Sequence, residues 1–161
     1  MPTLDIPDPG GLVQSQVVQS DALRLILNGS QSPNTQHSQF LNAFFGSGVQ
    51  HLAFSSDDIF ETVAFCQKNG VEILPIPENY YDDIEARFGL EPQLLDRLRA
   101  GNILYDRDDE GEYYQAYTKT FANRFFFELV ERRAYRGFGA ANAPIRLASQ
   151  TRMNRRSDGA K

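Results

Sequence analysis

The sequence is short of the residues that hold disulfides and metals: its 161 residues include one cysteine and two histidines. The single cysteine, Cys66, excludes an intramolecular disulfide framework and every zinc site built from clustered cysteines. With His37 and His51 alone, a metal site can take no more than two histidine ligands from one chain. The sequence also lacks a signal-peptide pattern and any run of 18 uninterrupted apolar residues, so we expect a cytoplasmic protein without a membrane span.

Positive charge is scarce as well, because 16 basic side chains face 21 acidic ones and the formal net charge is −5. Nucleic-acid binders normally carry a basic surplus or stripe, so the sequence predicts no nucleic-acid partner. An apolar share of 41% and a charged share of 23% are typical of globular proteins. A chain of this length can bury a core without disulfides or metals.

The pattern of apolar and turn residues predicts an α+β protein. After an extended arm in the first eleven residues, 12–18 and 22–27 have the composition of a hairpin, and 28–39 that of a polar loop. Asp58 and Glu61 form a helix-start signature. From residue 49 to 131 the expected order is strand, helix, strand, helical insert and three strands, which predicts a curled, largely antiparallel sheet. The expected elements are 49–55, the helix after Asp58, 71–74, 82–88 with 92–99, and then 103–105, 113–118 and 125–131.

His51 and Glu128 are the candidate metal ligands. His51 lies in a short apolar strand, where a lone histidine is either a hydrogen-bonded group or a ligand. Glu128 lies in the run FFFELV at 125–130, and a carboxylate buried there must be paired, protonated or metal-bound. Alternatively, Glu128 faces solvent on an edge strand, or pairs with Arg132 or Arg133. Imidazole plus carboxylate is the ligand chemistry of non-haem iron, which uses two histidines and one acid.

Two further segments carry candidate residues. Gln115 shares a strand face with Tyr113 and Tyr117, where its amide either orients a substrate oxygen or satisfies a neighbouring backbone group. The glycine-containing segment 137–142 is either a lid hinge or a plain chain turn. From Arg146 the chain is basic, and we expect a disordered tail over 146–161.

Several motifs together resemble one family. They are GSGVQHLAF at 46–54, DDI at 57–59, NYYD at 79–82, NILYD at 102–106, the stretch 111–119, RFFFELVER at 124–132 and GFGAAN at 137–142. In this order and spacing they resemble the C-terminal domain of 4-hydroxyphenylpyruvate dioxygenase, over about residues 12–145. The resemblance implies the vicinal oxygen chelate fold, in which paired βαβββ modules curl around a metal. On this basis 1–45 is the end of one module with a connecting loop, and 46–145 is a complete second module.

The resemblance also implies a chemistry: an Fe(II)-dependent dioxygenase acting on a 2-oxo acid or aromatic substrate. His51 matches the second histidine ligand of the family and Glu128 its carboxylate ligand. Gln50 and Gln115 match positions that hold substrate or the inner shell of the metal. Ser15 and Asn28 resemble substrate-contacting positions of the preceding module, and Phe138 matches a gate near the C-terminal helix.

The first histidine ligand of the family has no counterpart in this sequence. We therefore expect a truncated C-terminal portion with an incomplete site, weak metal binding and little dioxygenase activity. The motifs IPDP at 6–9 and NAPIR at 142–146 look closer to the dioxygenase-like domain of bacterial bifunctional 3-dehydroshikimate dehydratases. The alternatives are thus an accessory domain of such a dehydratase, or a metal-free binding module. A homo-oligomer is compatible with all of them.

Overall fold

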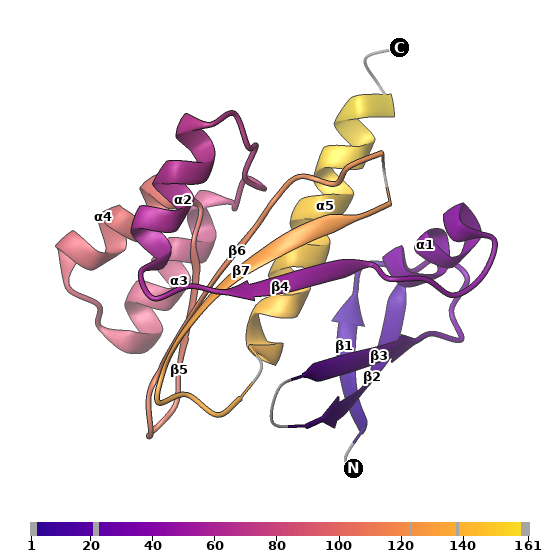
Figure 1. Cartoon of the computed structure of the whole chain (residues 1–161), viewed down its shortest axis with the longest axis horizontal. Coiled ribbons are helices and arrows are strands. Elements are labelled where there is room, and N and C mark those ends of the chain that lie inside the picture. Colours follow the sequence, from indigo (N-terminus) through magenta and orange to yellow (C-terminus); the bar gives the residue numbers. More distant parts are fainter. Residues whose placement is uncertain (1–2, 21–22, 123, 138, 159–161) are drawn as a thin grey trace.

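The structure is a computed structural model that describes residues 3–20, 23–122, 124–137 and 139–158. Its elements follow one another from the N-terminus, at the bottom of Figure 1, to the C-terminus at the top. They are β1 (Thr3–Asp8), β2 (Gly11–Gln19), β3 (Arg24–Gly29), α1 (Gln36–Phe44), β4 (His51–Ser55), α2 (Ile59–Lys68), α3 (Glu78–Phe88), α4 (Pro92–Gly101), β5 (Leu104–Arg107), β6 (Glu112–Tyr117), β7 (Phe126–Arg133), the 3-10 helix η1 (Ala140–Asn142) and α5 (Ala143–Asp158).

The described strands form two sheets. The smaller sheet is an antiparallel meander in the order β1-β2-β3, and the larger one has the order β4-β7-β6-β5. In the larger sheet β5, β6 and β7 are also an antiparallel meander, and β4 lies parallel to β7. The α+β class and the βαβββ module are therefore confirmed, with a mixed sheet.

Helices cover both faces of the larger sheet. On one face, α2 contacts β6 and β7, and α4 packs against α2. The buried residues there include Ile59, Val63 and Leu98, which alternate with polar positions at helical spacing. On the other face α5 crosses behind β6 and β7 in Figure 1 and also contacts β1 of the smaller sheet. The second face carries the candidate ligands.

The expected strand at 71–74 is reduced to one bridge between Ile73 and Thr118. Hydrogen bonds flank this bridge, from Leu74 N to the Tyr117 carbonyl and from Lys119 N to the Glu72 carbonyl. Pro75 and Pro77 follow immediately, and proline cannot donate a ladder hydrogen bond. The pairing therefore ends after one residue.

The C-terminal segment differs most from the prediction. Where a disordered tail was expected from residue 146, α5 runs from Ala143 to Asp158. Pro144 stands in the first turn, where its missing N–H removes no helical hydrogen bond. Beyond it the helix contains no glycine or proline, and basic residues such as Arg152 are exposed. Charge on the outer face is compatible with a helix whose inner face packs on the sheet.

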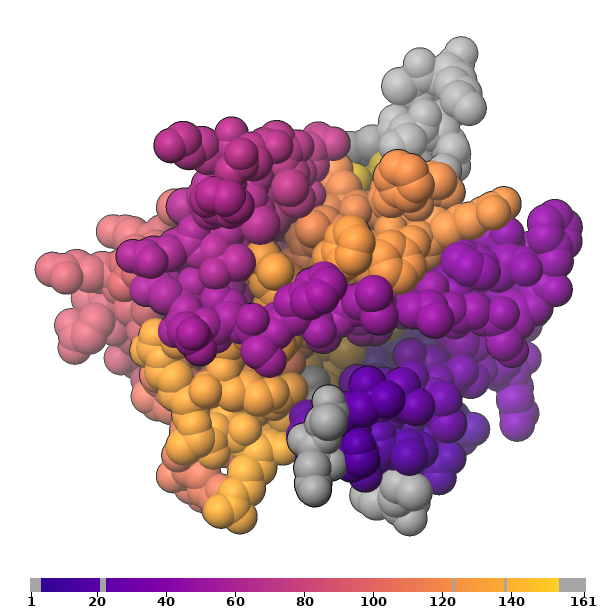
Figure 2. All heavy atoms as spheres, viewed as in Figure 1, coloured from indigo at the N-terminus to yellow at the C-terminus, as the bar shows by residue number. Residues whose placement is uncertain are grey.

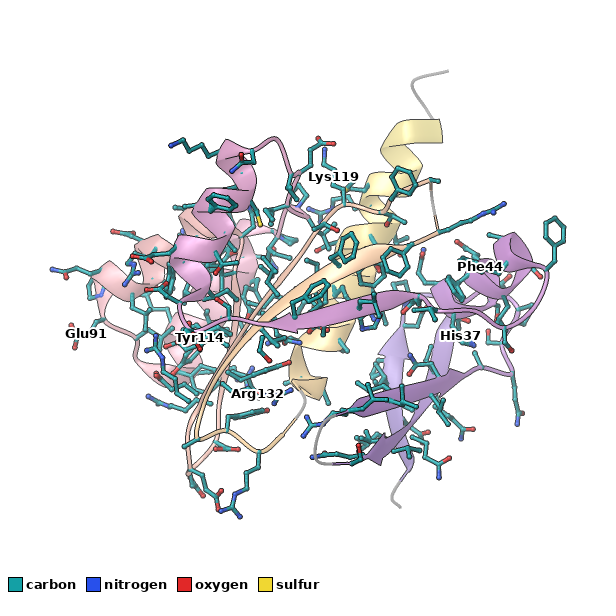
Figure 3. All side chains as sticks on the ribbon, in the orientation of Figure 1. His37, Phe44, Glu91, Tyr114, Lys119 and Arg132 are labelled. Atoms are coloured by element: carbon teal, nitrogen blue, oxygen red, sulfur yellow. The ribbon has the colours of Figure 1, made fainter. Side chains whose placement is uncertain are left out.

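The polar loop expected at 28–39 contains the start of α1, which Thr35 caps by accepting a hydrogen bond from Ser38 N. His37, in the first turn of α1, is buried and lies beside the smaller sheet in Figure 3. Asp8 at the end of β1 accepts a hydrogen bond from Gln36 N and so ties α1 to that sheet. Burial lowers the pKa of His37, partly opposed by the charge of Asp8.

Candidate functional site

The parallel pairing of β4 and β7 brings His51 and Glu128 together. In the register His51 is opposite Phe126, and Ala53 is opposite Glu128, so the two candidate ligands are diagonal neighbours on one face. His51 Nε2 lies 3.5 Å from Glu128 Oε2. The imidazole stacks on the ring of Phe126, with a centroid distance of 4.8 Å and an interplanar angle of 9°. This stacking fixes the plane of the imidazole.

The two carboxylate oxygens of Glu128 have different partners. Oε1 accepts hydrogen bonds from Gln115 Nε2 at 2.7 Å and from the Tyr117 hydroxyl at 3.0 Å. Oε2 is the oxygen that faces His51. Alternation along β6 and β7 places these side chains on the same face of the sheet. Oε2 and His51 Nε2 are therefore the atoms oriented to share a ligand.

The alternative roles considered for Glu128 do not apply. Glu128 is buried, so it does not face solvent. Arg133 instead forms an ion pair with Glu131, at 2.6 Å from Nε to Oε1. Arg132, near the lower end of β7 in Figure 3, donates to the Tyr113 hydroxyl and the Gly137 carbonyl.

The surroundings keep Glu128 ionised. Burial acts to raise the pKa of its carboxyl, but His51 and the hydrogen bonds from Gln115 and Tyr117 outweigh it, so the pKa lies below its ordinary value. Burial, together with the Glu128 charge, holds the pKa of Tyr117 well above 10. Tyr117 is thus a neutral hydrogen-bond donor at neutral pH, and Glu128 is an anionic acceptor.

A chain of buried hydrogen bonds extends from Glu128 into the rest of the fold. Gln115 Oε1 accepts from Asn142 Nδ2 at 2.9 Å, and Asn142 Oδ1 lies 3.1 Å from the Tyr80 hydroxyl. The same hydroxyl accepts from Tyr105 N at 2.7 Å. Because both ends of the Gln115 amide are partnered, its orientation is determined. The chain links the candidate ligand to η1, α3 and β5.

Two polar atoms near this centre lack a partner. His51 Nδ1 and Gln50 Oε1 are buried and accept or donate no hydrogen bond among the described residues. Gln50 directly precedes β4, and its carbonyl accepts from Phe126 N. Buried polar groups are normally satisfied, so the unpartnered His51 Nδ1, which belongs to a candidate ligand, is compatible with a bound polar group.

The other predicted substrate positions lie apart from this cluster. Ser15 is fully buried, and its hydroxyl donates to Asn28 Oδ1 across the β2–β3 pair of the smaller sheet. Within the described residues no hydrogen bond links this pair to His51 or Glu128. Phe138 falls outside the described residues. Cys66 is a free thiol that packs against the core.

The donor set can be tested against a divalent metal. A neutral imidazole nitrogen and an anionic carboxylate oxygen suit Fe(II) and related ions. Glu128 is deprotonated, and its Oε2 and His51 Nε2 face each other. No group of three His, Cys, Asp or Glu side chains that could hold a metal occurs in the described part of the chain. The residues present therefore fit part of a metal site, with His51 and Glu128 as two candidate ligands.

Sequence reasoning missed two residues of this cluster, Asn142 and Arg146. Both belong to the segment that was read as a turn and a tail, so no pattern placed them against the sheet. Tyr117 was recognised as sharing a face with Gln115, but its hydrogen bond to Glu128 depends on the register of β6 against β7.

Comparison with known proteins identifies the family. The model for the Glyoxalase/Bleomycin resistance protein/Dioxygenase superfamily matches residues 5–97. The chain therefore belongs to this superfamily, in agreement with the βαβββ module. For the residues that the structure describes, no helix is long and apolar enough to cross a bilayer.

Particular relatives are similar over most of this chain. A 3-dehydroshikimate dehydratase of Pseudomonas putida is 48% identical over 151 residues, which are 91% of this chain and 24% of that protein. A 4-hydroxyphenylpyruvate dioxygenase of Pseudomonas aeruginosa is 34% identical over 122 residues, 74% of this chain and 34% of that protein. A solved xylose isomerase-like TIM barrel/4-hydroxyphenylpyruvate dioxygenase fusion protein superposes with a TM-score of 0.77 and 44% identity, over 94% of this chain and 25% of that one. The chain thus spans about a quarter of the length of its dehydratase relatives.

Proposed function

We propose that this chain is a 4-hydroxyphenylpyruvate dioxygenase-like metal-binding domain that takes a 2-oxo acid or related aromatic ligand. The observation that carries the proposal is the pairing of His51 Nε2 with Glu128 Oε2 at 3.5 Å, while Oε1 is held by Gln115 and Tyr117. Fe(II) is the proposed metal, and when bound it supplies the Lewis acidity and redox chemistry of a non-haem iron centre.

The residues of the chain have separate tasks in this proposal. His51 and Glu128 hold the metal. Gln115 and Tyr117 orient Glu128, and second-sphere hydrogen bonds of this kind maintain ligand geometry. Gln50 offers its unpartnered amide oxygen to the ligand. Ser15, Asn28 and Phe138 remain predicted ligand contacts.

We also propose that the third metal ligand comes from outside the described residues, in a longer protein or in a second chain. The chain is as much as 48% identical to 3-dehydroshikimate dehydratases but spans a quarter of them, which favours an accessory domain fused to a dehydratase. Under that alternative the dehydration is carried out elsewhere in the longer protein. A cytoplasmic location is proposed because Cys66 is unpaired.

Titration with Co(II), followed by its visible absorption, tests the metal proposal in the 161-residue chain. We expect the parent to bind Co(II), and His51→Ala and Glu128→Ala each to bind at least about tenfold more weakly. The matched controls are His37→Gln, which removes the other histidine, and Glu131→Gln, which changes the other buried glutamate of β7. Equal binding by the parent, His51→Ala and Glu128→Ala would contradict the proposal and favour a metal-free binding module.

A further inference from the structure

The buried face of the last helix carries polar residues among apolar ones, since Ile145 and Met153 pack against the hydrophobic core. Arg146, Ser149 and Gln150 are buried on α5, and Asn142 is buried immediately before it. Residues three and four apart share a helix face, so these positions form one row together with the apolar Leu147. The inner face of a helix is normally apolar because buried polar groups carry a desolvation cost. The polar members of this row therefore require hydrogen-bonding partners inside the fold.

Arg146 is the charged member of this row and lies over the candidate metal site. Its guanidinium carbon is 5.4 Å from the ring centre of Phe126 and 5.6 Å from that of Tyr117. Phe126 is the ring on which His51 stacks, and the Tyr117 hydroxyl donates to Glu128. The guanidinium thus reaches the aromatic pair that supports both candidate ligands.

The positive charge of Arg146 has no anionic partner within the described residues. Its Nη1 donates to Gln150 Oε1 at 2.8 Å, which is a neutral acceptor. The ion pairs of the described residues all involve other side chains. A buried cation is normally paired, and a guanidinium has five N–H donors, so Arg146 retains donor capacity for an anion.

Ser149 gives an independent indication at the same place. Its side chain is buried one turn after Arg146, and its Oγ has no hydrogen-bond partner. A buried hydroxyl that lacks an acceptor suits a bound oxygen-rich group. Arg146 and Ser149 together leave both a charge and a hydroxyl unsatisfied on one side of the candidate metal site.

We infer that Arg146 is a ligand-binding residue that holds the carboxylate of an aryl 2-oxo acid, with Ser149 as a second donor. The inference rests on the proposed function, because it places the carboxylate beside His51 and Glu128. A guanidinium and a carboxylate form a bidentate pair with two parallel, charge-assisted hydrogen bonds. The ammonium group of a lysine cannot reproduce this geometry. Arg146 would thereby select acids over neutral ligands of the same shape.

Binding of 4-hydroxyphenylpyruvate and of its neutral methyl ketone analogue, 4-hydroxyphenylacetone, tests this inference by calorimetry without added metal. We expect the parent to prefer the acid, and Arg146→Gln to weaken acid binding about tenfold or more while leaving the ketone unchanged. Arg146→Lys should retain part of the preference. Arg152→Gln changes an exposed arginine of the same helix and should behave like the parent.

Each outcome decides the inference. A parent that binds neither compound, or that binds both equally, contradicts it. So does an Arg146→Gln protein that loses affinity for both compounds alike, since that pattern belongs to a structural arginine. If Arg146→Gln does not fold, the acid preference of Arg146→Lys relative to the parent decides instead. The metal proposal fails separately, when Co(II) binding does not depend on His51 or Glu128 although the acid preference persists.

Discussion

At the scale of single residues, the two carboxylate oxygens of Glu128 have different roles in the candidate site. One oxygen is held by Gln115 and Tyr117, and the other is directed at His51. The hydrogen bonds to Oε1 fix the orientation of the Glu128 side chain. Oε2 is therefore already positioned to bind the proposed metal. This is the arrangement expected of a preorganised ligand.

Tyr117→Phe removes one of the two hydrogen bonds to Glu128 Oε1 without changing the ring. We expect the variant to bind Co(II) about tenfold more weakly, because second-sphere partners contribute roughly 10- to 100-fold to metal affinity. Tyr135→Phe is the matched control, since its hydroxyl donates to Asp106 and not to the candidate ligands. Unchanged Co(II) affinity in Tyr117→Phe would show that this hydrogen bond does not position Glu128.

Alternation along strands singled out the candidate residues, and the family resemblance gave them their expected roles. His51, Glu128 and Gln115 stand out as polar residues in apolar strands, and a fixed register brings them together. Arg146 could not be found in this way, because its role depends on how α5 docks against the sheet. The Ser15–Asn28 pair shows a different limit of sequence reasoning. The two residues pair within the smaller sheet, but no local sequence pattern predicts the distance of that sheet from the candidate ligands.

At the scale of elements, the start of α2 depends on a residue of β7. Asp58 accepts hydrogen bonds from Phe60 N and Glu61 N, as the helix-start signature predicts. Glu131, buried on β7, accepts from Ile59 N at 2.9 Å. A carboxylate at this position satisfies a free N–H group and interacts favourably with the helix dipole.

Glu131→Ala should therefore lower the free energy of unfolding by about 2 kcal/mol, because Ile59 N loses its acceptor in a buried position. Glu131→Gln should cost less, since an amide oxygen can still accept. Glu61→Ala removes an exposed carboxylate from the first turn of the same helix and should cost only a few tenths of a kcal/mol. Urea denaturation measures all three, and equal effects of Glu131→Ala and Glu61→Ala would contradict the role of Glu131.

The link between the sheet and α5 passes through Gly139. Its φ is 67°, and a Cβ added there would lie 2.3 Å from Tyr113 Cε1 and 2.5 Å from Gln115 Oε1. The segment 137–142 was considered as either a hinge or a turn. Here a glycine is required both by the backbone conformation and by the close approach of Gln115.

Gly139→Ala should reduce stability and also weaken Co(II) binding, because displaced Gln115 no longer holds Glu128. Gly89→Ala is a matched control: Gly89 has a similar φ of 59°, but a Cβ there meets nothing within 4 Å. It should cost about 1 kcal/mol from backbone strain alone and leave Co(II) affinity unchanged. A Gly139→Ala protein with parental Co(II) affinity would contradict the coupling.

Elements were predicted well wherever periodicity and turn residues agreed, as for α2 and β6. They were predicted poorly where tertiary contacts decide. The bridge at Ile73 is ended by proline chemistry in the neighbouring residues. The inner face of α5 mixes polar Arg146 and Ser149 with apolar Leu147, so no clear apolar stripe marks the helix in the sequence.

At the scale of the whole molecule, the two open sheets leave four strand edges unpaired in the described chain, among them those of β3 and β4. β7 has β4 as a parallel partner, whereas the corresponding last strand of the smaller meander, β3, has no such partner. Both β3 and β4 expose apolar side chains, among them Leu27 at 54% and Phe54 at 51%. The purple atoms of the β4 region lie openly along the face in Figure 2. Exposed apolar edges are typical of surfaces that pair with further strands.

We therefore expect the isolated chain to self-associate with rising concentration, and Phe54→Lys to suppress this. Sedimentation velocity measures the effect. Phe65→Lys is the matched control, because Phe65 is an exposed aromatic residue too, on α2 and away from a strand edge. The proposal that the exposed strand edges associate is contradicted if the parent stays monomeric at every concentration. It is also contradicted if Phe65→Lys suppresses association and Phe54→Lys does not.

The most direct test of the central claim is the affinity for Co(II) with and without saturating 4-hydroxyphenylpyruvate. If His51 and Glu128 hold a metal to which the acid also binds, the acid raises the Co(II) affinity of the parent by a factor on the order of ten. The same acid leaves the affinity of the His51→Ala, Glu128→Ala double variant unchanged. Equal Co(II) affinities for the parent and the double variant, with the acid present, would contradict the account.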